Sequence, residues 1–301
     1  MEKTPMIEVR HVTKEYPVTD EKVVALDDIN LTINKGEICC IFGPSGSGKS
    51  TLLNQLAGLE KPTRGGIRMN GTVISSLNEA QLASFRQKNL GFIFQAYNLL
   101  PSMTALENTA MPLMFQGINK KTRKKAAAYM LKQVGLANRM DHYPNQMSGG
   151  QQQRVGIARA FVSKPAIILA DEPTGNLDSK SSKEVMDMIQ DFAHRYHQTI
   201  VLVSHSPDAA QYADHIVHLF DGRIVKEEFR TPKPSENSST ASGLSSEQKS
   251  VLDSASSQNQ VKRHNCDLQD SVPEEDQTSE THPANPNSAQ TNPADSKAEL
   301  V

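Results

Sequence analysis

Eight consecutive residues carry the clearest chemical signal in this chain. They are Gly43, Pro44, Ser45, Gly46, Ser47, Gly48, Lys49 and Ser50. They fit G-x-x-x-x-G-K-[ST], the pattern of loops that bind nucleotide phosphates. Glycines let backbone N–H groups approach phosphate oxygens, and a following helix presents its amino end to the same anion. Lys49 is expected to reach the β- and γ-phosphates, and the Ser50 hydroxyl to bind Mg²⁺. A chance match arises in roughly one chain of this length in a hundred.

A second element suits the same chemistry because it ends in two acids. The apolar stretch 166–170 runs directly into Asp171 and Glu172. An acid at the carboxyl end of a parallel strand lies where such sheets bind ligands. We expect Asp171 to hold Mg²⁺, directly or through water, and Glu172 to polarise the water that attacks the γ-phosphate. Alone, this stretch fits an acidic turn equally well. Together with the phosphate loop it predicts a nucleoside triphosphatase.

The stretch 147–154, Met-Ser-Gly-Gly-Gln-Gln-Gln-Arg, resembles the signature motif of ATP-binding-cassette (ABC) ATPases. That motif is usually written L-S-G-G-Q, and this chain has Met at its first position. Ser148 is a good helix N-cap, and the two glycines permit close approach of the backbone to phosphate. The resemblance implies that this motif covers the ATP bound to a second copy of the chain. The residues implied in that contact are Ser148, Gly149, Gly150 and Gln151.

Further motifs of the same family follow in order along the chain. Gln95 resembles the Q-loop glutamine, which in the family senses Mg²⁺ and the attacking water. Asp178 closes a stretch that resembles the D-loop, and His205 resembles the switch histidine that contacts the γ-phosphate. Tyr16 matches the aromatic residue that stacks on adenine, and Thr51 completes the implied nucleotide-binding set. Taken singly, most of these side chains are structural, so only the ordered set favours a functional role for them.

The resemblance covers about residues 7 to 230, and two stretches within it point to a particular subgroup of the family. The stretches 95–108 and 171–178 are similar to those of the lipoprotein-releasing and macrolide-export ATPases, although related peptide-resistance and cell-division cassettes share them. The resemblance implies a head-to-tail homodimer of the cassette that hydrolyses ATP with Mg²⁺. It also implies an integral-membrane permease subunit as partner, to which Gln95 and the segment after it transmit motion. Apolar candidates for that contact are Leu99, Leu100, Leu113 and Phe115.

Alternatives to a transporter subunit remain at this point. A soluble ABC ATPase that acts on ribosomes or nucleic acid usually carries two cassettes or long coiled-coil insertions. Here each motif occurs once, and the roughly 100 residues between Ser50 and Ser148 show no sustained heptads. A regulator of a cell-wall enzyme that works through a permease-like partner would share every motif. A phosphate-loop kinase is disfavoured by the signature stretch.

The elements that must position these residues follow from hydrophobic patterns. Strands are predicted over residues 7–9, 29–33, 37–42, 166–170 and 199–204. A helix is predicted over 49–58. Between about residues 82 and 164 the pattern turns helical, with helices predicted over 126–135 and after Ser148. The Asp221-Gly222 pair predicts a hairpin turn. The order predicts an α/β fold with a parallel sheet. As an ABC-type P-loop NTPase, the chain would add an N-terminal antiparallel β subdomain and an inserted helical subdomain at about 96–164.

Composition divides the chain of 301 residues in two. From Pro232 onward, five Lys or Arg face eleven Asp or Glu, so the segment 232–301 carries −6, whereas the whole chain carries only −2 and the remainder therefore +4. The segment is rich in Ser, Asn, Gln and Pro and has no periodic apolar face, so we expect an acidic, disordered tail. The modest charge of the remainder argues weakly against nucleic-acid binding. Its densest basic run, 120–125, is expected to be a solvated helix face.

Several classes of protein are not expected. No run of 18 apolar residues suggests direct insertion into a membrane, and the start of the chain has no apolar core of a signal peptide. We therefore expect a cytoplasmic protein, peripheral on the inner face of the plasma membrane through its permease. The adjacent Cys39 and Cys40 are expected to be reduced thiols that point to opposite faces of a strand.

Overall fold

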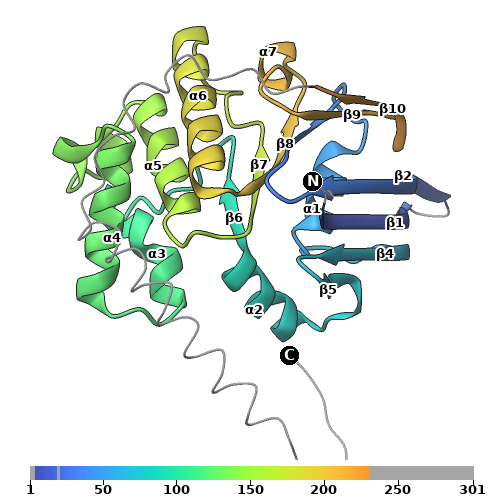
Figure 1. Cartoon of the computed structure of the whole chain (residues 1–301), viewed down its shortest axis with the longest axis horizontal. Coiled ribbons are helices and arrows are strands. Elements are labelled where there is room, and N and C mark those ends of the chain that lie inside the picture. Colours follow the sequence, from blue (N-terminus) through green and yellow to red (C-terminus); the bar gives the residue numbers. More distant parts are fainter. Residues whose placement is uncertain (1–3, 19–20, 231–301) are drawn as a thin grey trace, which may run out of the picture. The chain divides into compact units, whose positions relative to one another are not determined.

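The computed structural model describes residues 4–18 and 21–230 (Figure 1). The predicted tail 232–301 lies outside the described residues. A six-stranded sheet has the order β10-β9-β3-β8-β7-β6. Its strands are β3 (Ile38–Phe42), β6 (Leu90–Ile93), β7 (Ile167–Asp171), β8 (Thr199–Ser204), β9 (His215–Phe220) and β10 (Arg223–Phe229). All neighbours pair in parallel except β10, which is antiparallel to β9. The predicted parallel sheet is confirmed.

The central strand β3 explains why the parallel strands have continuous apolar sequences. Both of its faces are covered, as is usual for parallel strands. Cys40 packs in the cluster that contains Phe161 and Phe192, whereas Cys39 packs in the cluster that contains Leu52. Burial raises the pKa of the Cys40 thiol to about 12 and that of Cys39 well above its usual value. The prediction of two reduced thiols on opposite faces of the strand is confirmed.

The second sheet is antiparallel, with the order β2-β1-β4-β5. It consists of β1 (Pro5–Val18), β2 (Glu21–Asn34), β4 (Arg64–Met69) and β5 (Thr72–Val73). The inward side chains of β1, such as Ile7 and Val9, share one buried cluster with Leu52 and Leu56 of α1 (Lys49–Leu56). Figure 1 shows α1 beside this sheet. The predicted N-terminal antiparallel β subdomain is present.

Between β6 and β7 the chain is helical, in α3 (Ala105–Phe115), α4 (Lys120–Gln133) and α5 (Gly149–Phe161), with short 3-10 turns at Ala137–Arg139 and Pro144–Gln146. The remaining helices are α2 (Glu79–Asn89), α6 (Ser179–Tyr196), α7 (Pro207–Ala210) and the 3-10 turn Ile74–Ser76. α4 begins earlier than predicted because the Asn119 side chain accepts a hydrogen bond from the Thr122 amide at 2.9 Å. The basic run at its start is largely exposed, as expected.

One expectation was wrong. The region 82–164 is not helical throughout, because Leu90–Ile93 form β6, which pairs in parallel with β7. A four-residue apolar run is too short for periodicity to distinguish a strand from a helix. Among the described residues, no helix is both long and apolar enough to cross a membrane.

Candidate functional site

The phosphate loop joins β3 to α1, as predicted. Gly46 and Gly48 have φ angles of 81° and 100°, in the left-handed region that glycine adopts without strain. At Gly43 the limit is space, because a Cβ atom would lie 2.2 Å from the carbonyl oxygen of Leu219. The three glycines of the motif therefore permit this backbone path, each for a conformational or a steric reason.

Two polar side chains inside the loop fit an anionic ligand. Lys49 is only 6% exposed, and its Nζ donates to the carbonyl oxygen of Pro44 at 2.7 Å. The buried Ser47 Oγ has no hydrogen-bond partner among the described residues. A buried ammonium without a paired carboxylate and an orphaned hydroxyl are both costly unless a ligand satisfies them. Ser50 follows on the exposed side of the first turn of α1, and Thr51 is half-buried.

The predicted acids, Asp171 and Glu172, lie at the carboxyl end of β7, which neighbours β8 in the sheet. In the sheet register, Asp171 of β7 is opposite Val203 of β8, and Phe42, directly before the loop, is opposite Ser204. Asp171 is half-buried, and its pKa is raised first by burial and then by the neighbouring Glu172, against the opposing effect of Lys49. A cation at this position would relieve both effects. The Asp171 carboxylate and the Ser50 hydroxyl are hard oxygen donors, so the donor set fits Mg²⁺.

Glu172 and His205 form the polar pair of the site. His205 Nδ1 lies 2.8 Å from Glu172 Oε1. Glu172 has a φ of 41°, a left-handed conformation that is strained for a non-glycine residue, and its amide donates to the carbonyl oxygen of Val203 at 3.0 Å. Both side chains line a cavity of about 540 Å³. The Glu172 side chain is 20% exposed and the His205 side chain 58%, so both are accessible from solvent.

Gln95 follows β6 and contacts the stretch that leads to Asp178. The Asn176 side chain donates to the Gln95 carbonyl at 2.9 Å, and Gln95 Nε2 lies 3.5 Å from Asn176 Oδ1. A Cβ atom on Gly175 would lie 2.7 Å from Gln95 Nε2. Asp178 caps α6, accepting from the amides of Lys180 and Ser181, and these hydrogen bonds lower its pKa. Asn176 was not among the predicted site residues, although it lies inside the D-loop-like stretch.

The signature residues start α5 and lie in a different place. Ser148 and Gln151 form a capping box, in which the Gln151 amide donates to Ser148 Oγ at 3.4 Å and the Ser148 amide to Gln151 Oε1 at 3.1 Å. Ser148, Gly150 and Gln151 line a cavity of about 220 Å³. Within the described residues, this cavity shares no lining residue with the one that contains Glu172. The chain therefore does not bring its own signature residues into the Glu172 cavity.

Tyr16 lies on β1 with its hydroxyl bonded to Glu60. Burial and this carboxylate raise the pKa of the phenol. Lys14 Nζ lies 5.0 Å from the centre of the ring. The half-buried ring is thus held in place by two charged neighbours. The contact with Glu60 had not been predicted, because contacts between β1 and the residues after α1 leave no pattern in the sequence. Stacking of adenine on Tyr16 stays a prediction.

Comparison with known proteins agrees with this geometry. The family model described as ABC transporter matches residues 26–175. An uncharacterized ABC transporter ATP-binding protein of Methanocaldococcus jannaschii is 49% identical over 221 residues, which are 73% of this chain and 98% of that protein. The macrolide export ATP-binding/permease protein MacB of Shewanella sp. (strain W3-18-1) is 43% identical over 229 residues, 76% of this chain, and the chain spans 35% of that protein. The dimeric ATP-binding cassette MJ0796, in a post-hydrolysis state bound to ADP and Pi, superimposes with a TM-score of 0.71 at 41% identity. The match covers 75% of this chain and 100% of that one.

The glycine loop between a parallel strand and a helix, with acids at the end of a nearby parallel strand, defines a P-loop nucleoside triphosphatase. Within that class, the chain belongs to the family of ABC transporter ATP-binding domains and is an ATPase of the ABC type. The fold predicted from the sequence is thereby confirmed.

Proposed function

We propose that two copies of this chain bind and hydrolyse ATP head to tail and so power a separate integral-membrane permease. The observation that carries the proposal is the division of the site within one chain. The phosphate loop, Glu172 and His205 follow the carboxyl ends of β3, β7 and β8, whereas Ser148 lines a different cavity from Glu172 and His205. A second copy is needed to bring a signature motif to the bound ATP. The dimeric state of the cassette MJ0796 supports this arrangement.

Each residue of the site has a proposed task. The amides of the phosphate loop and Lys49 bind the phosphates of ATP. Ser50, Asp171 and Gln95 hold Mg²⁺, which when bound neutralises phosphate charge. Glu172 accepts a proton from the attacking water, and His205, bonded to Glu172, orients that carboxylate and contacts the γ-phosphate. Closure of the dimer then depends on the γ-phosphate, and hydrolysis removes the charge that joins the two copies.

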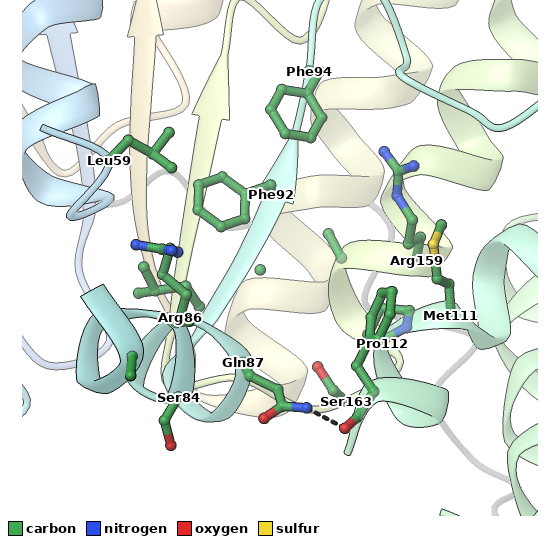
Figure 2. A pocket seen from close by; sticks show the side chains of 16 residues that line it. Leu59, Ser84, Arg86, Gln87, Phe92, Phe94, Met111, Pro112, Arg159 and Ser163 are labelled. Carbon is green, nitrogen blue, oxygen red and sulfur yellow. Dashed lines mark hydrogen bonds between the residues drawn. The ribbon is translucent and has the colours of Figure 1, made fainter. Parts of the chain in front are cut away.

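The surface proposed for the permease is a groove of about 760 Å³, here called the α2–α3 groove (Figure 2). It is lined by Leu59, Ala80, Ala83, Ser84, Arg86, Gln87, Leu90, Gly91, Phe92, Phe94, Met111, Pro112, Phe115, Arg159, Ala160 and Ser163. Phe115, one of the apolar contact candidates from the sequence, is 62% exposed at its edge. Leu113 is not available for such a contact because it is only 2% exposed.

The two sides of this groove are joined at one end. The Gln87 side chain donates to the Phe115 carbonyl, as the dashed line in Figure 2 marks, and the Gln116 side chain donates to the Gln87 carbonyl at 2.8 Å. The lining includes Phe92 of β6 and Phe94, the residue after β6, and their rings stack with centres 5.7 Å apart. The chain runs from these residues directly into Gln95, so an apolar segment seated in the groove would contact the strand that positions Gln95.

The permease also fixes the proposed location, peripheral on the inner face of a membrane. The MacB relative is named an ATP-binding/permease protein, and this chain spans 35% of it. Here the cassette would meet its permease as a separate subunit. Export or mechanical transmission is the proposed use of the energy, in keeping with the macrolide-export relatives.

The test separates hydrolysis from partnership. Glu172→Gln should bind ATP and form a stable dimer with turnover reduced at least about 100-fold, as expected for loss of a general base. Phosphate release and light scattering with ATP measure the two properties, and Glu79→Gln, an exposed acid at the start of α2 that belongs to none of the motifs, is the matched control. Full hydrolysis by Glu172→Gln would contradict the assignment of the base. Detergent extraction of tagged Glu172→Gln from native membranes with ATP should recover a membrane protein, and recovery of ribosomal proteins alone would contradict the permease.

A further inference from the structure

A buried glutamine of α5 is hydrogen-bonded to the backbone directly after Glu172. Gln153 lies five positions after Ser148, on the inner side of the helix, and is fully buried. Its Nε2 donates to the carbonyl oxygen of Pro173 at 2.5 Å, and Pro173 is the residue that follows Glu172. A side chain of the helical region is thereby joined to the short segment of backbone that carries the proposed general base.

Only one half of the Gln153 amide is satisfied. Its Oε1 lies beside Gly156, where a Cβ atom would be 3.6 Å away, and it has no hydrogen-bond partner among the described residues. A buried carbonyl without a partner is destabilising, and a Met side chain of similar length would avoid this cost. The stability of the fold therefore does not explain an amide at this position. What the amide provides, and Met lacks, is the N–H donor to Pro173.

The backbone that receives this hydrogen bond is strained at Glu172. A residue before proline favours extended conformations, whereas Glu172 has a φ of 41°. Two backbone hydrogen bonds restrain Glu172 itself, from its amide to the Val203 carbonyl and from the Gly175 amide to its carbonyl, both at 3.0 Å. The bond from Gln153 acts on the next carbonyl along the chain. It therefore limits rotation on the far side of Pro173, which would otherwise turn the Glu172 side chain away from its present direction.

We propose that Gln153 is a positioning residue for ATP hydrolysis. Its hydrogen bond to the Pro173 carbonyl holds Glu172 where the carboxylate can accept a proton from the attacking water. The inference rests on the proposed function, because it takes Glu172 as the general base. Gln153 is not among the described residues that line the Glu172 cavity, so it acts through Glu172 and not on the substrate. A misplacement of about 1 Å in a reacting group can cost about 100-fold in rate.

The fold contains a matched control at the other end of β7. Gln198 is 3% exposed, its Nε2 donates to the carbonyl oxygen of Pro165 at 2.8 Å, and its Oε1 has no partner among the described residues. Gln153 and Gln198 therefore share their burial, a hydrogen bond to a proline carbonyl and an unpaired oxygen. Pro165 precedes β7, whereas Pro173 follows it. Of these two glutamines, only Gln153 is bonded to the backbone next to Glu172.

Gln153→Met and Gln198→Met separate a positioning role from a structural one. Each variant leaves one proline carbonyl without its donor, so both should lower the melting temperature by a similar few degrees. Only Gln153→Met should lower kcat, by at least about tenfold, with KM for ATP changed by less than about twofold because the phosphate loop is untouched. Thermal melting and steady-state phosphate release by the full chain measure these quantities. An unchanged kcat in Gln153→Met, or an equal fall in both variants, would overturn the inference.

A double-mutant cycle with Glu172→Gln tests whether Gln153 acts through Glu172. In single-turnover reactions with protein in excess, Glu172→Gln alone should retain slow hydrolysis. Adding Gln153→Met should change that rate by less than about twofold, because the group that Gln153 positions is already lost. Losses that multiply would show that Gln153 acts elsewhere in the fold, and this would overturn the inference.

Two further results keep the inference testable. Full hydrolysis by Glu172→Gln alone would contradict the proposed function, whereas slow hydrolysis by Glu172→Gln beside an unchanged kcat in Gln153→Met would contradict this inference only. If Gln153→Met does not fold, Gln153→Asn takes its place. It keeps a buried amide but is one methylene too short to reach the Pro173 carbonyl, so kcat should fall in the same way, and an unchanged kcat would overturn the inference.

Discussion

The imidazole of His205 and the carboxylate of Glu172 face each other at 2.8 Å across the ends of two adjacent strands. β8 ends one residue before His205, and β7 ends one residue before Glu172. The amide of Glu172 is bonded in addition to Val203 of β8. The orientation of Glu172 is thus set by the backbone of β8 and by the side chain of His205, and a further hydrogen bond, from the Gly175 amide to the Glu172 carbonyl at 3.0 Å, supports its strained φ angle.

His205→Ala should therefore reduce turnover without unfolding the protein. We expect kcat to fall about 100-fold, as for other losses of a group that assists proton transfer, with a smaller change in KM for ATP. Because the side chain is 58% exposed, the free energy of unfolding should change by no more than about 0.5 kcal/mol. Steady-state phosphate release and urea unfolding measure the two effects. Unchanged kcat would contradict the role of this pair.

Gly149→Ala should destabilise the chain for a steric reason. A Cβ atom at this position would lie 2.7 Å from Tyr97 Oη, closer than the two atoms can approach. Overpacking of this kind costs about 1–3 kcal/mol, more than alanine gains over glycine in a helix. Adding Tyr97→Phe should restore stability, because the remaining ring carbon is 3.6 Å away. Gly150→Ala is the control in the same helical turn, where the Cβ atom would meet Ser181 Oγ at 3.6 Å. Urea unfolding of the four proteins decides the matter.

His215 should make stability depend on pH. It is fully buried on β9, with Nδ1 2.7 Å from Glu37 and Nε2 2.9 Å from Glu227. Burial alone would lower its pKa, but the hydrogen bonds and charges of Glu37 and then Glu227 outweigh burial and raise it. Because the pKa is higher in the folded state, the protonated imidazole stabilises the folded protein. This stabilisation is complete below the ordinary histidine pKa of about 6.5, and it is lost as the pH rises through the pKa of the folded state.

The measurement compares the free energy of unfolding in urea of His215→Gln with that of the unchanged chain. The pH range is about 5.5 to about 9, from about one unit below the ordinary histidine pKa to about two and a half units above it. The loss in free energy of unfolding caused by His215→Gln should be largest at the acidic end of the range and should become smaller as the pH rises. His218→Gln, on the same strand and partly exposed, is the control. A deficit that grew with pH would mean that the imidazole is neutral in the folded protein.

Removal of residues 231–301 should leave ATP hydrolysis and melting temperature essentially unchanged. Every predicted site residue precedes Arg230, and the amide of Arg230, which ends the described part of the chain, donates to the carbonyl of Asp214 at 2.7 Å. The matched comparison is a chain that ends at Asp214. It lacks β9, which pairs with β3 inside the sheet, and it should not fold. A loss of hydrolysis in the longer truncation would assign the acidic segment a part in the reaction.

Local sequence was sufficient wherever one segment determines its own geometry. Thr199–Ser204 form β8 with the predicted ends, because the apolar run is bounded by polar residues on both sides. Asp221 and Gly222 make the expected turn with φ angles of 44° and 74°. Ser148 caps α5 as its type and position indicate. The phosphate loop was predictable for the same reason, since the positions of its glycines indicate the backbone conformation of the loop.

Contacts between distant segments were beyond such reasoning. Arg159 looked like one more polar residue in a helix, and only the fold brings it to the carbonyls of Tyr97 and Asn98. Tyr97 against Gly149 and Asn176 against Gln95 are of the same kind. No spacing in one sequence encodes such pairs, because each depends on how separate elements pack.

The turn between β9 and β10 is hydrogen-bonded to the phosphate loop, and this contact affects when the loop can take its final shape during protein synthesis. The carbonyl of Ser47 accepts from the amide of Gly222 at 3.0 Å, and Gly222 accepts from the amide of Asp27 at 2.8 Å. β3, which leads into the loop, has β8 and β9 as its neighbours. A nascent chain therefore carries the nucleotide-binding sequence through most of its translation without the partners that shape it. We therefore expect full affinity for ATP only after the β9–β10 hairpin has left the ribosome, near the end of the cassette.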